Sequence, residues 1–514
     1  MSDQGDQASG QGGPDRSSRT GRQRPPARNR SAQHRSSQRP SERARRTDPA
    51  RLAAYTVMRD VAQGAYANLA LPKHLREKRI SGRDAGFATE LVYGATRLRG
   101  LYDAVASVAA DRPVDRIDPR VLDTLRLGAH QLLGMRVPTH AAVDETVALA
   151  RQVNGAGAAG FVNAVMRRIS ERDLDTWLQV VTERTADPLE ALAVRTSHPA
   201  WVVKALRAAL IGHGTATASD VDEPLTALLA ADNAPPRVSL VARPGLSSVD
   251  ELVDAGAEVS PTSPVGAVLP EGDPGAVAAV REGRAAVQDE GSQLLALALA
   301  AADVTGEAAA HERWLDLCAG PGGKAGLLAA LAVQRRIPFV ANEVSEHRTD
   351  LVRQTLEAAR VAAAAAGTTV EVRTGDGRDV GTDEPGRYSR VLVDAPCTGL
   401  GALRRRPEAR WRRTPGDVAA LAGLQRELLA SAIEATAAGG LIAYATCSPH
   451  LNETRFVVAD VLKKRDDVEV VDARSLFRDA SGNVLAGLGD GPYVQLWPHV
   501  HGTDAMFLAL LRRR

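Results

Sequence analysis

The stretch WLDLCAGPGGKAGLLAAL, residues 314–331, most constrains what this chain can fold into. Trp314 to Leu317 form a short apolar run typical of a buried strand, and an apolar run from about Gly323 predicts a helix. The glycine-rich turn between them lets a ligand approach the backbone closely, and it directs the N–H groups of the helix N-terminus at that ligand. The segment therefore predicts a strand–turn–helix unit of an α/β fold that binds a ligand at the turn.

Three kinds of ligand compete for this turn. A phosphate-binding loop is excluded, because Cys318 stands where its first glycine belongs and Ala325 follows the lysine. A dinucleotide fingerprint is met by Gly320, Gly322 and Ala325, and Glu343 follows about 20 residues later, where a carboxylate binds ribose hydroxyls. S-adenosylmethionine also contains a ribose, so these residues leave NAD and S-adenosylmethionine both open.

Polar residues follow the later apolar runs as well. Asp376, a candidate for the adenine end of a cofactor, follows one run, Asp394 and Cys397 follow the next, and Cys447 follows LIAYAT. The carboxyl ends of parallel strands meet at one edge of a sheet, so a single cleft collects the cofactor loop and two thiols. A nicotinamide dehydrogenase has no need of two cysteines there, which favours S-adenosylmethionine.

The cysteines also bear on metals and on location. The chain has 3 cysteines, without a C-x2-C pair, which disfavours zinc and a disulfide framework. His499 and His501 are expected to be surface or loop residues, so we predict no metal. Free cysteines suit a reducing compartment, and the sequence has no run of roughly 18 apolar residues. We therefore predict a cytoplasmic protein without a membrane span.

A methyl donor beside a thiol suggests one reaction. Carbon 5 of a pyrimidine is too poor a nucleophile to attack a sulfonium methyl group directly. A thiolate that adds to carbon 6 activates carbon 5, and the thiol is eliminated after methyl transfer.

Several motifs resemble those of the RNA (cytosine-5)-methyltransferases. DLCAGPGGK, DAPCTGLG and YATCSPHLNET look like motifs I, IV and VI of that family, and VQDEGSQL resembles the segment that opens its catalytic core. GRDAGFATELVYGATRLRG, RVPTHAAVDETV and GFVNAVMRRI resemble the NusB-like helical domain of the Sun/Fmu-type bacterial ribosomal RNA methyltransferases. The resemblance covers about residues 48–514 and implies 16S ribosomal RNA as the substrate.

The resemblance implies a role for each motif residue. Cys447 would be the nucleophile and Cys397 would help to release the methylated RNA. DNA cytosine methyltransferases use the cysteine of the Pro-Cys motif for attack, so this assignment depends on the resemblance alone. The implied S-adenosylmethionine-binding residues are Cys318, Ala319, Gly320, Pro321, Gly322, Gly323, Lys324, Glu343, Asp376 and Asp394. The family commonly has alanine at Gly320 and aspartate at Glu343, and we expect Cys318 to be a small packing group.

A basic segment follows the Pro-Cys motif. RRRPEARWRR, residues 404–413, holds six arginines around one tryptophan. Such a segment can bind phosphates while its aromatic ring stacks on a base. A solvated basic loop is the alternative, and we predict RNA contact through Arg404, Arg405, Arg406, Arg410, Trp411 and Arg412.

The predicted organisation has four parts. Residues 1–47 form a disordered basic tail, since the first 50 residues contain 11 arginines, no lysine and five acids. That tail either aids solubility or binds polyanions. Residues 48–174 form an all-α NusB-like RNA-binding domain of five or six short helices, and 175–284 form a small α+β domain with a helix or two. Residues 285–514 form a Rossmann-like doubly wound α/β core.

We therefore expect a monomeric, S-adenosylmethionine-dependent methyltransferase that makes 5-methylcytosine in 16S ribosomal RNA. Transfer RNA is the alternative substrate. The alternative of another class is a non-catalytic RNA-binding ribosome-assembly factor, against which the presence of Cys447, Cys397 and Asp394 argues.

Overall fold

The structure is a computed structural model that describes residues 47–183 and 185–514. The predicted disordered tail, residues 1–47, lies outside these residues except for Thr47.

The chain continues from there into a helical region. It contains the α-helices α1 (Pro49–Ala62), α2 (Ala67–Glu77), α3 (Gly82–Arg97), α4 (Arg99–Ala110), α5 (Pro119–Leu133), α6 (Thr139–Val153) and α7 (Ala156–Ile169). Among the described residues these are seven helices, where five or six were predicted. One reason is that the helical run is interrupted at Leu98, which separates α3 from α4. Asp48 and Asp118 cap α1 and α5 by accepting backbone N–H groups, each just before a proline at the first helical position.

The next region has more helix than the predicted one or two. Its helices are α8 (Leu174–Thr182), α9 (Pro188–Thr196), α10 (Ala200–Gly212), α11 (Asp222–Asn233), α12 (Val249–Asp254) and α13 (Ala278–Arg281). Its sheet has the order β2-β3-β1-β4, formed by β1 (Val238–Ala242), β2 (Glu258–Val259), β3 (Gly266–Leu269) and β4 (Ala285–Val287). Apolar side chains of α9, α10 and α11 share one hydrophobic core with Leu400, Leu403 and Trp497 of the last region. The domain boundaries at residues 174 and 284 stay a prediction.

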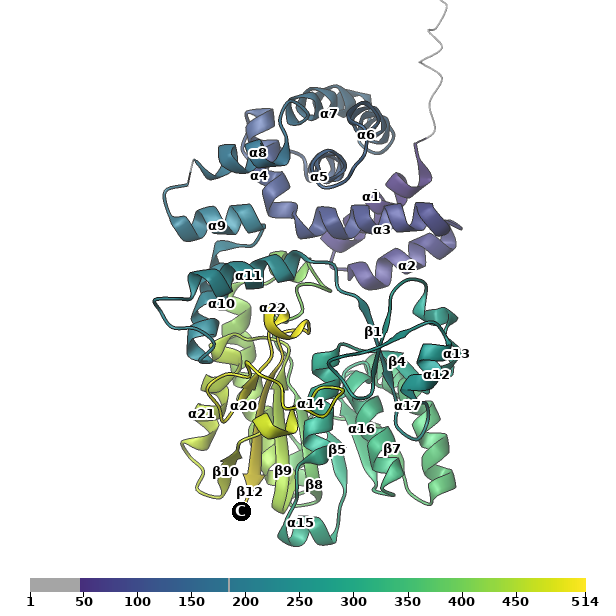
Figure 1. Cartoon of the computed structure of the whole chain (residues 1–514), viewed down its shortest axis with the longest axis vertical. Coiled ribbons are helices and arrows are strands. Elements are labelled where there is room, and N and C mark those ends of the chain that lie inside the picture. The colour runs from purple at the N-terminus through teal and green to yellow at the C-terminus, as the bar shows by residue number, and fades with distance from the viewer. Residues whose placement is uncertain (1–46, 184) are drawn as a thin grey trace, which may run out of the picture. The chain divides into compact units, whose positions relative to one another are not determined.

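The last region contains a large sheet in the order β10-β12-β9-β8-β5-β6-β7 (Figure 1). Its strands are β5 (Trp314–Asp316), β6 (Phe339–Glu343), β7 (Val370–Thr374), β8 (Tyr388–Asp394), β9 (Thr436–Thr446), β10 (Val468–Val471), β11 (Val494–Gln495) and β12 (Phe507–Arg513). Strands β5 to β9 are parallel, and β12 is antiparallel to both of its neighbours. The strand order reverses between β5 and β8, and ligands bind outside the carboxyl ends of the strands at such a point.

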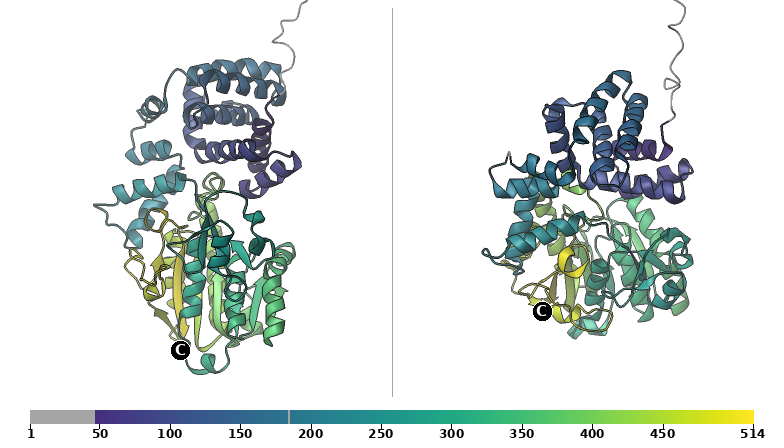
Figure 2. Two further views of the ribbon diagram at one scale, coloured as in Figure 1. Left: turned by 45° about the vertical axis from the view of Figure 1, so that its right-hand side comes forward. Right: turned by 45° about the horizontal axis from the view of Figure 1, so that its top comes forward.

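Helices cover both faces of this sheet (Figures 1 and 2). The helices of this region are α14 (Glu290–Ala301), α15 (Gly306–Ala310), α16 (Gly323–Gln334), α17 (Glu346–Ala366), α18 (Val380–Asp383), α19 (Ala409–Arg412), α20 (Pro415–Ala435), α21 (Arg455–Leu462) and α22 (Pro498–His501). Successive side chains of a strand point to opposite faces. On β8, Leu392 therefore packs in the core shared with α14, α16 and α17, whereas Val391 and Val393 pack in the core shared with α18, α20 and α21. The predicted doubly wound core, preceded by an α+β region and a helical region, is confirmed.

Candidate active site

The turn after β5 needs its glycines. Gly320 and Gly322 have φ values of 57° and 98°, a backbone region that favours glycine. A Cβ atom at Gly322 would also lie 2.8 Å from the Cβ atom of Thr355 on α17. This close packing holds the turn at the carboxyl end of β5, where α16 begins.

Two of the predicted cofactor carboxylates have clear partners. Glu343 is 2% exposed, and its Oε2 accepts the N–H of Gly320 at 3.0 Å, so it fixes the glycine-rich turn to the end of β6. Asp376 is half-buried, and hydrogen bonds from Arg378 lower the pKa of its carboxyl group. Glu343 lies against the cofactor loop, and Asp376 follows β7 at the same edge of the sheet.

Asp316, at the end of β5, is a further candidate that the sequence reasoning missed. Its Oδ1 accepts the N–H of Cys318 at 3.3 Å, whereas its Oδ2 is buried and has no hydrogen-bond partner among the described residues. Burial and the charge of Asp394 raise the pKa of Asp316 to about 8. An unpaired carboxylate oxygen under a glycine-rich turn fits the cationic amino group of S-adenosylmethionine. The sequence signal was present, since the acid stands two residues before Cys318.

Lys324 and Asp394 form an ion pair at the switch between β5 and β8. The Nζ atom of Lys324 donates to Oδ2 of Asp394 at 2.8 Å, and the lysine side chain is 9% exposed. Burial acts to lower the pKa of Lys324, but the adjacent carboxylate outweighs it and keeps the pKa above its ordinary value. The lysine is therefore a fixed cation, and its charge acts on Cys447.

The structure brings the two predicted catalytic thiols together. Cys397 follows β8 and Cys447 follows β9, and their Sγ atoms are 3.5 Å apart. Both cysteines are free and partly exposed. The hydrogen bond between the two thiols lowers the pKa of Cys447, against the effect of burial, and the charge of Lys324 acts in the same direction. The same contact and burial raise the pKa of Cys397. The thiolate of the pair is thus best stabilised at Cys447.

The third cysteine differs from this pair. Burial and then the charge of Asp316 raise the pKa of Cys318 well above its ordinary value. Cys318 therefore forms a thiolate less readily than Cys447 does, which is compatible with the packing role predicted for it.

Glu453 ties the two cysteine loops together, and the sequence reasoning did not single it out. Its carboxylate is completely buried and accepts the Thr398 N–H at 2.7 Å and the Ser448 hydroxyl at 2.6 Å. The Thr398 hydroxyl also donates to this carboxylate. Thr398 follows Cys397 and Ser448 follows Cys447, so one carboxylate sets the separation of the two thiols.

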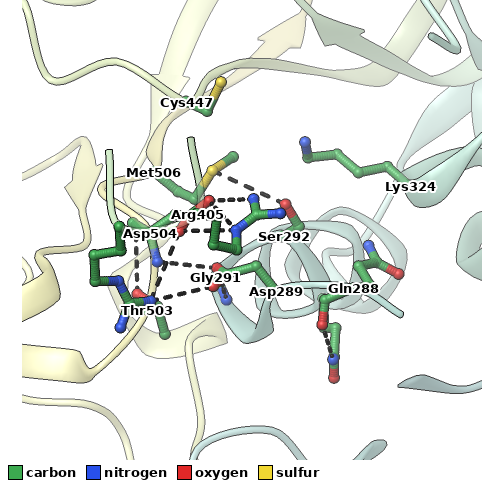
Figure 3. A network of polar contacts seen from close by, with 12 residues as sticks. Gln288, Asp289, Gly291, Ser292, Lys324, Arg405, Cys447, Thr503, Asp504 and Met506 are labelled. Atoms are coloured by element: carbon green, nitrogen blue, oxygen red, sulfur yellow. Dashed lines mark hydrogen bonds and ion pairs between the residues drawn. The ribbon is translucent and has the colours of Figure 1, made fainter. Parts of the chain in front are cut away.

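A second polar network lies beside Cys447 (Figure 3). The Nε atom of Arg405 donates to Oδ2 of Asp504 at 2.9 Å, and the Asp504 N–H donates to Oδ1 of Asp289 at 3.0 Å. Burial, and next the charge of Asp504, raise the pKa of Asp289 to about 7. The network connects the segment that opens the catalytic region to the loop before β12.

The basic segment 404–413 differs from the predicted RNA-binding stripe. Arg410 is completely buried and donates to Asn233 Oδ1 at 2.8 Å and to the Ser197 carbonyl at 3.1 Å. Arg412 donates to backbone carbonyls, among them Val61 at 2.9 Å, and the Trp411 ring stacks with the guanidinium of Arg99. These three residues bind the helical regions to the catalytic region, because their side chains reach carbonyls and rings of those regions.

RNA contact through the rest of the segment stays a prediction. Arg404 is 9% exposed and Arg405 half-buried, whereas Arg406 is exposed. The Arg410 guanidinium is completely buried and its hydrogen bonds go to groups of the protein itself, so Arg410 has a structural role in place of the predicted one.

Comparison with known proteins decides the family. Residues 304–512 match the family model described as 16S rRNA methyltransferase RsmB/F, and residues 48–171 match the NusB family model. The chain is 52% identical over 474 residues, 92% of its length and 98% of the relative, to "Putative methyltransferase MT1451" of Mycobacterium tuberculosis (strain CDC 1551 / Oshkosh). It is 33% identical to the Ribosomal RNA small subunit methyltransferase B of Pseudomonas syringae pv. tomato (strain ATCC BAA-871 / DC3000), over 90% of this chain and 96% of that protein.

The chain belongs to the RsmB/F methyltransferase family. It is accordingly an S-adenosylmethionine-dependent RNA methyltransferase, and the predicted cofactor is confirmed. Among solved structures, the crystal structure of PH0851 matches with a TM-score of 0.71 at 20% identity, over 91% of this chain and 99% of that one. At that identity the match shows the fold alone.

Two further observations concern membranes and metals. In the part of the chain that the structure describes, every helix is too short or too polar to cross a lipid bilayer. Within residues 47–183 and 185–514, no three His, Cys, Asp or Glu side chains are grouped so that they could hold a metal ion. His501 accepts the Trp497 N–H at 2.9 Å and contacts the Ala486 carbonyl, and His499 is on the same short helix α22.

Proposed function

We propose that this RsmB/F-family enzyme methylates carbon 5 of a cytosine in 16S ribosomal RNA through a covalent adduct with Cys447. One observation carries the proposal: two free thiols lie 3.5 Å apart at the ends of neighbouring parallel strands, beside the switch point of the sheet. A methyltransferase that acts on an oxygen or an exocyclic nitrogen needs no thiol at this position.

The chemistry uses each thiol once. The Cys447 thiolate adds to carbon 6 of the cytosine, and the electron pair that this displaces makes carbon 5 nucleophilic. S-adenosylmethionine supplies an electrophilic methyl group on its sulfonium. After carbon 5 has gained the methyl group, a base removes the proton from carbon 5, the carbon–sulfur bond breaks, and Cys447 leaves as a thiolate. We propose that Cys397, whose thiol neighbours that of Cys447, assists this elimination.

The chain's own residues prepare this reaction. Lys324 and the Cys397 S–H stabilise the Cys447 thiolate, and Asp394 holds the lysine ammonium in place. We propose that the glycine-rich turn 318–324, Glu343, Asp376 and Asp394 bind the donor, and that Asp316 binds its amino group. The unpaired oxygen of Asp316 lies under the turn, which supports its role.

The RNA substrate is supported by the relatives. Two proteins that each align with 90% of this chain are named ribosomal RNA small subunit methyltransferase B. We place the enzyme in the cytoplasm as a monomer that acts on ribosomal RNA.

The test is a methyl transfer assay with purified protein and labelled S-adenosylmethionine, run in parallel with unmodified 16S ribosomal RNA and with unmodified transfer RNA and followed by nucleoside analysis. We expect label in 5-methylcytosine. Label in a different nucleoside would contradict the chemistry, and label only in transfer RNA would contradict the substrate. Donor binding without any transfer would leave a non-catalytic RNA-binding protein.

A further inference from the structure

We propose that a cavity between α3 and the Arg404–Arg406 segment binds a nucleotide of the substrate RNA that flanks the target cytosine. The cavity has a volume of about 370 Å³, within the range of roughly 300–1,000 Å³ for small-ligand sites. It is lined by Tyr93 and Arg97 of α3, Arg237 before β1, and Gln288 after β4, among other residues. The inference rests on the proposed function, because it takes RNA as the substrate.

Two buried side chains in this cavity have no partner. Arg97 is 5% exposed, and its guanidinium makes no hydrogen bond or ion pair within residues 47–183 and 185–514. The Glu90 carboxylate also lines the cavity and its charge acts on Arg97, but its contact at hydrogen-bond distance is with Nε2 of His130 at 3.1 Å. Gln288 is 6% exposed, and neither atom of its side-chain amide has a partner in the described chain. Leaving a buried cation and a buried amide unpaired destabilises a protein by several kcal/mol.

The unpaired groups specify the chemistry of the occupant. A buried guanidinium suits a phosphate, and a free amide suits the edge of a base, since it both donates and accepts hydrogen bonds. Tyr93 is half-buried, and its ring supplies an aromatic surface of the kind on which bases stack. Arg237 and Arg406 are exposed cations on the lining. A nucleotide within an RNA strand has all of these features together.

Two residues of the lining, Arg405 and Gln288, connect the cavity to the surroundings of Cys447. The charges of Arg405 and Cys447 interact. Gln288 precedes Asp289, whose carboxylate belongs to the network beside Cys447 (Figure 3). A nucleotide in the cavity is therefore a near neighbour of the base at Cys447, and the helical region takes part in substrate recognition through α3.

Two variants test the cavity. Arg97→Met and Gln288→Leu remove the unpaired groups but keep side chains of similar size. In the 16S ribosomal RNA assay we expect each to raise the KM and the Kd for RNA roughly tenfold, with kcat and the KM for S-adenosylmethionine unchanged. Arg151→Gln is the control, since Arg151 is an exposed arginine of α6 outside the cavity. It should leave the KM for RNA within twofold of the wild-type value. A KM for RNA that is unchanged in both variants would refute the cavity, whereas a wild type without transfer would refute the proposed function.

A cross-linking experiment tests the same site in the unaltered protein. Unmodified 16S ribosomal RNA transcribed with 4-thiouridine is irradiated with the full-length enzyme, and the cross-linked peptides are identified by mass spectrometry. We expect peptides that contain Tyr93 or Gln288, and the loss of these cross-links when unlabelled RNA is in excess. Specific cross-links that map only to other surfaces would overturn the proposal, even if Arg97→Met fails to fold.

Discussion

The two cysteine loops and the cavity beside α3 both contain buried polar side chains, but they differ in how these groups are paired. Around Glu453, the carboxylate accepts hydrogen bonds from Thr398 and Ser448. In the cavity, the Arg97 guanidinium and the Gln288 amide have no partner among the described residues.

The difference separates two tasks. Hydrogen bonds that are complete in the free enzyme hold reactive groups in one geometry, which a covalent mechanism needs before the substrate arrives. Groups that are left unpaired form favourable interactions only when a ligand binds, so they suit recognition of a substrate. The account predicts that changes at the paired site alter the rate of chemistry, and that changes at the unpaired site alter affinity.

The largest effect is expected for Cys447→Ala. Without the thiolate that attacks carbon 6, methyl transfer should fall by about 10⁴-fold or more, because residues that act as a unit in covalent catalysis have effects of this size. Donor binding, measured by calorimetry, should be unchanged. The matched variant is Cys318→Ala, which removes the cysteine of the cofactor loop. It should alter mainly the KM for the donor, and a comparable loss of kcat in this variant would contradict the assignment of Cys447.

Glu453→Gln should have the next largest effect. The amide replaces one acceptor oxygen with a donor, which then faces the N–H and hydroxyl groups of Thr398 and Ser448. We expect kcat to fall by roughly tenfold to a hundredfold, as for other residues that position reactive groups, with the KM for RNA unchanged. Glu307→Gln, at an exposed site on α15, is the control. A rise in the KM for RNA without a change in kcat would break the distinction between the two regions.

The pH dependence of alkylation tests the state of the thiols. A thiol with a lowered pKa is ionised at lower pH, so in the absence of RNA Cys447 should react with iodoacetamide at a lower pH than Cys318, whose pKa is raised. Cys397→Ala removes the donated hydrogen bond and Lys324→Met removes a cation, so each should move the midpoint for Cys447 to higher pH. Mass spectrometry of the alkylated peptides measures both midpoints. A midpoint that does not move in either variant would show that neither group stabilises the thiolate.

The smallest effect on activity is expected for Asp232→Asn. Asp232 is buried, and its carboxylate oxygens make no hydrogen bond in the described chain, although His198 lies 3.8 Å away; Asp232 does not line the cavity. Burial raises its pKa to about 7. Between about pH 4 and pH 7, Asp232 is therefore protonated in the folded state but ionised in the unfolded state. The free energy of unfolding falls as the pH rises through this range.

Removing this carboxyl group should change the stability of the protein but not its binding of RNA. The free energy of unfolding of the Asn variant, minus that of the wild type, is measured by urea unfolding at pH 5 and at pH 8. This difference should be on the order of 1–3 kcal/mol larger at pH 8. Its KM for RNA should equal that of the wild type. A raised KM would show that unpaired groups affect RNA binding even where no ligand reaches them.

The sequence predicted the parts of the site that follow strands. Apolar runs that end in Glu343, Asp394 and Cys447 became β6, β8 and β9, because side chains that are buried on both faces leave a clear apolar signal. The loop 318–324 was likewise predictable, since its two positive-φ glycines are needed by the turn itself.

Contacts between distant segments were not predictable in this way. Glu453 stands six residues after Cys447, but nothing in its local pattern shows that its carboxylate reaches Thr398, 55 residues away. The arginines of 404–413 were predicted to contact RNA, with a solvated basic loop as the alternative, and both interpretations assume accessible side chains. Arg410 is instead buried and finds its partners in Ser197 and Asn233. The cavity unites Arg97 with Gln288, which no periodicity or motif connects.

The most direct measurement of the central claim is the covalent adduct itself. The wild type, Cys447→Ala and Cys397→Ala are incubated with labelled 16S ribosomal RNA and S-adenosylmethionine, denatured, treated with ribonuclease and separated by electrophoresis. We predict a stable protein–RNA adduct that accumulates in Cys397→Ala and is absent in Cys447→Ala. An adduct that accumulates in Cys447→Ala and is lost in Cys397→Ala would contradict the assignment of the nucleophile, and an adduct in neither variant would contradict the covalent mechanism.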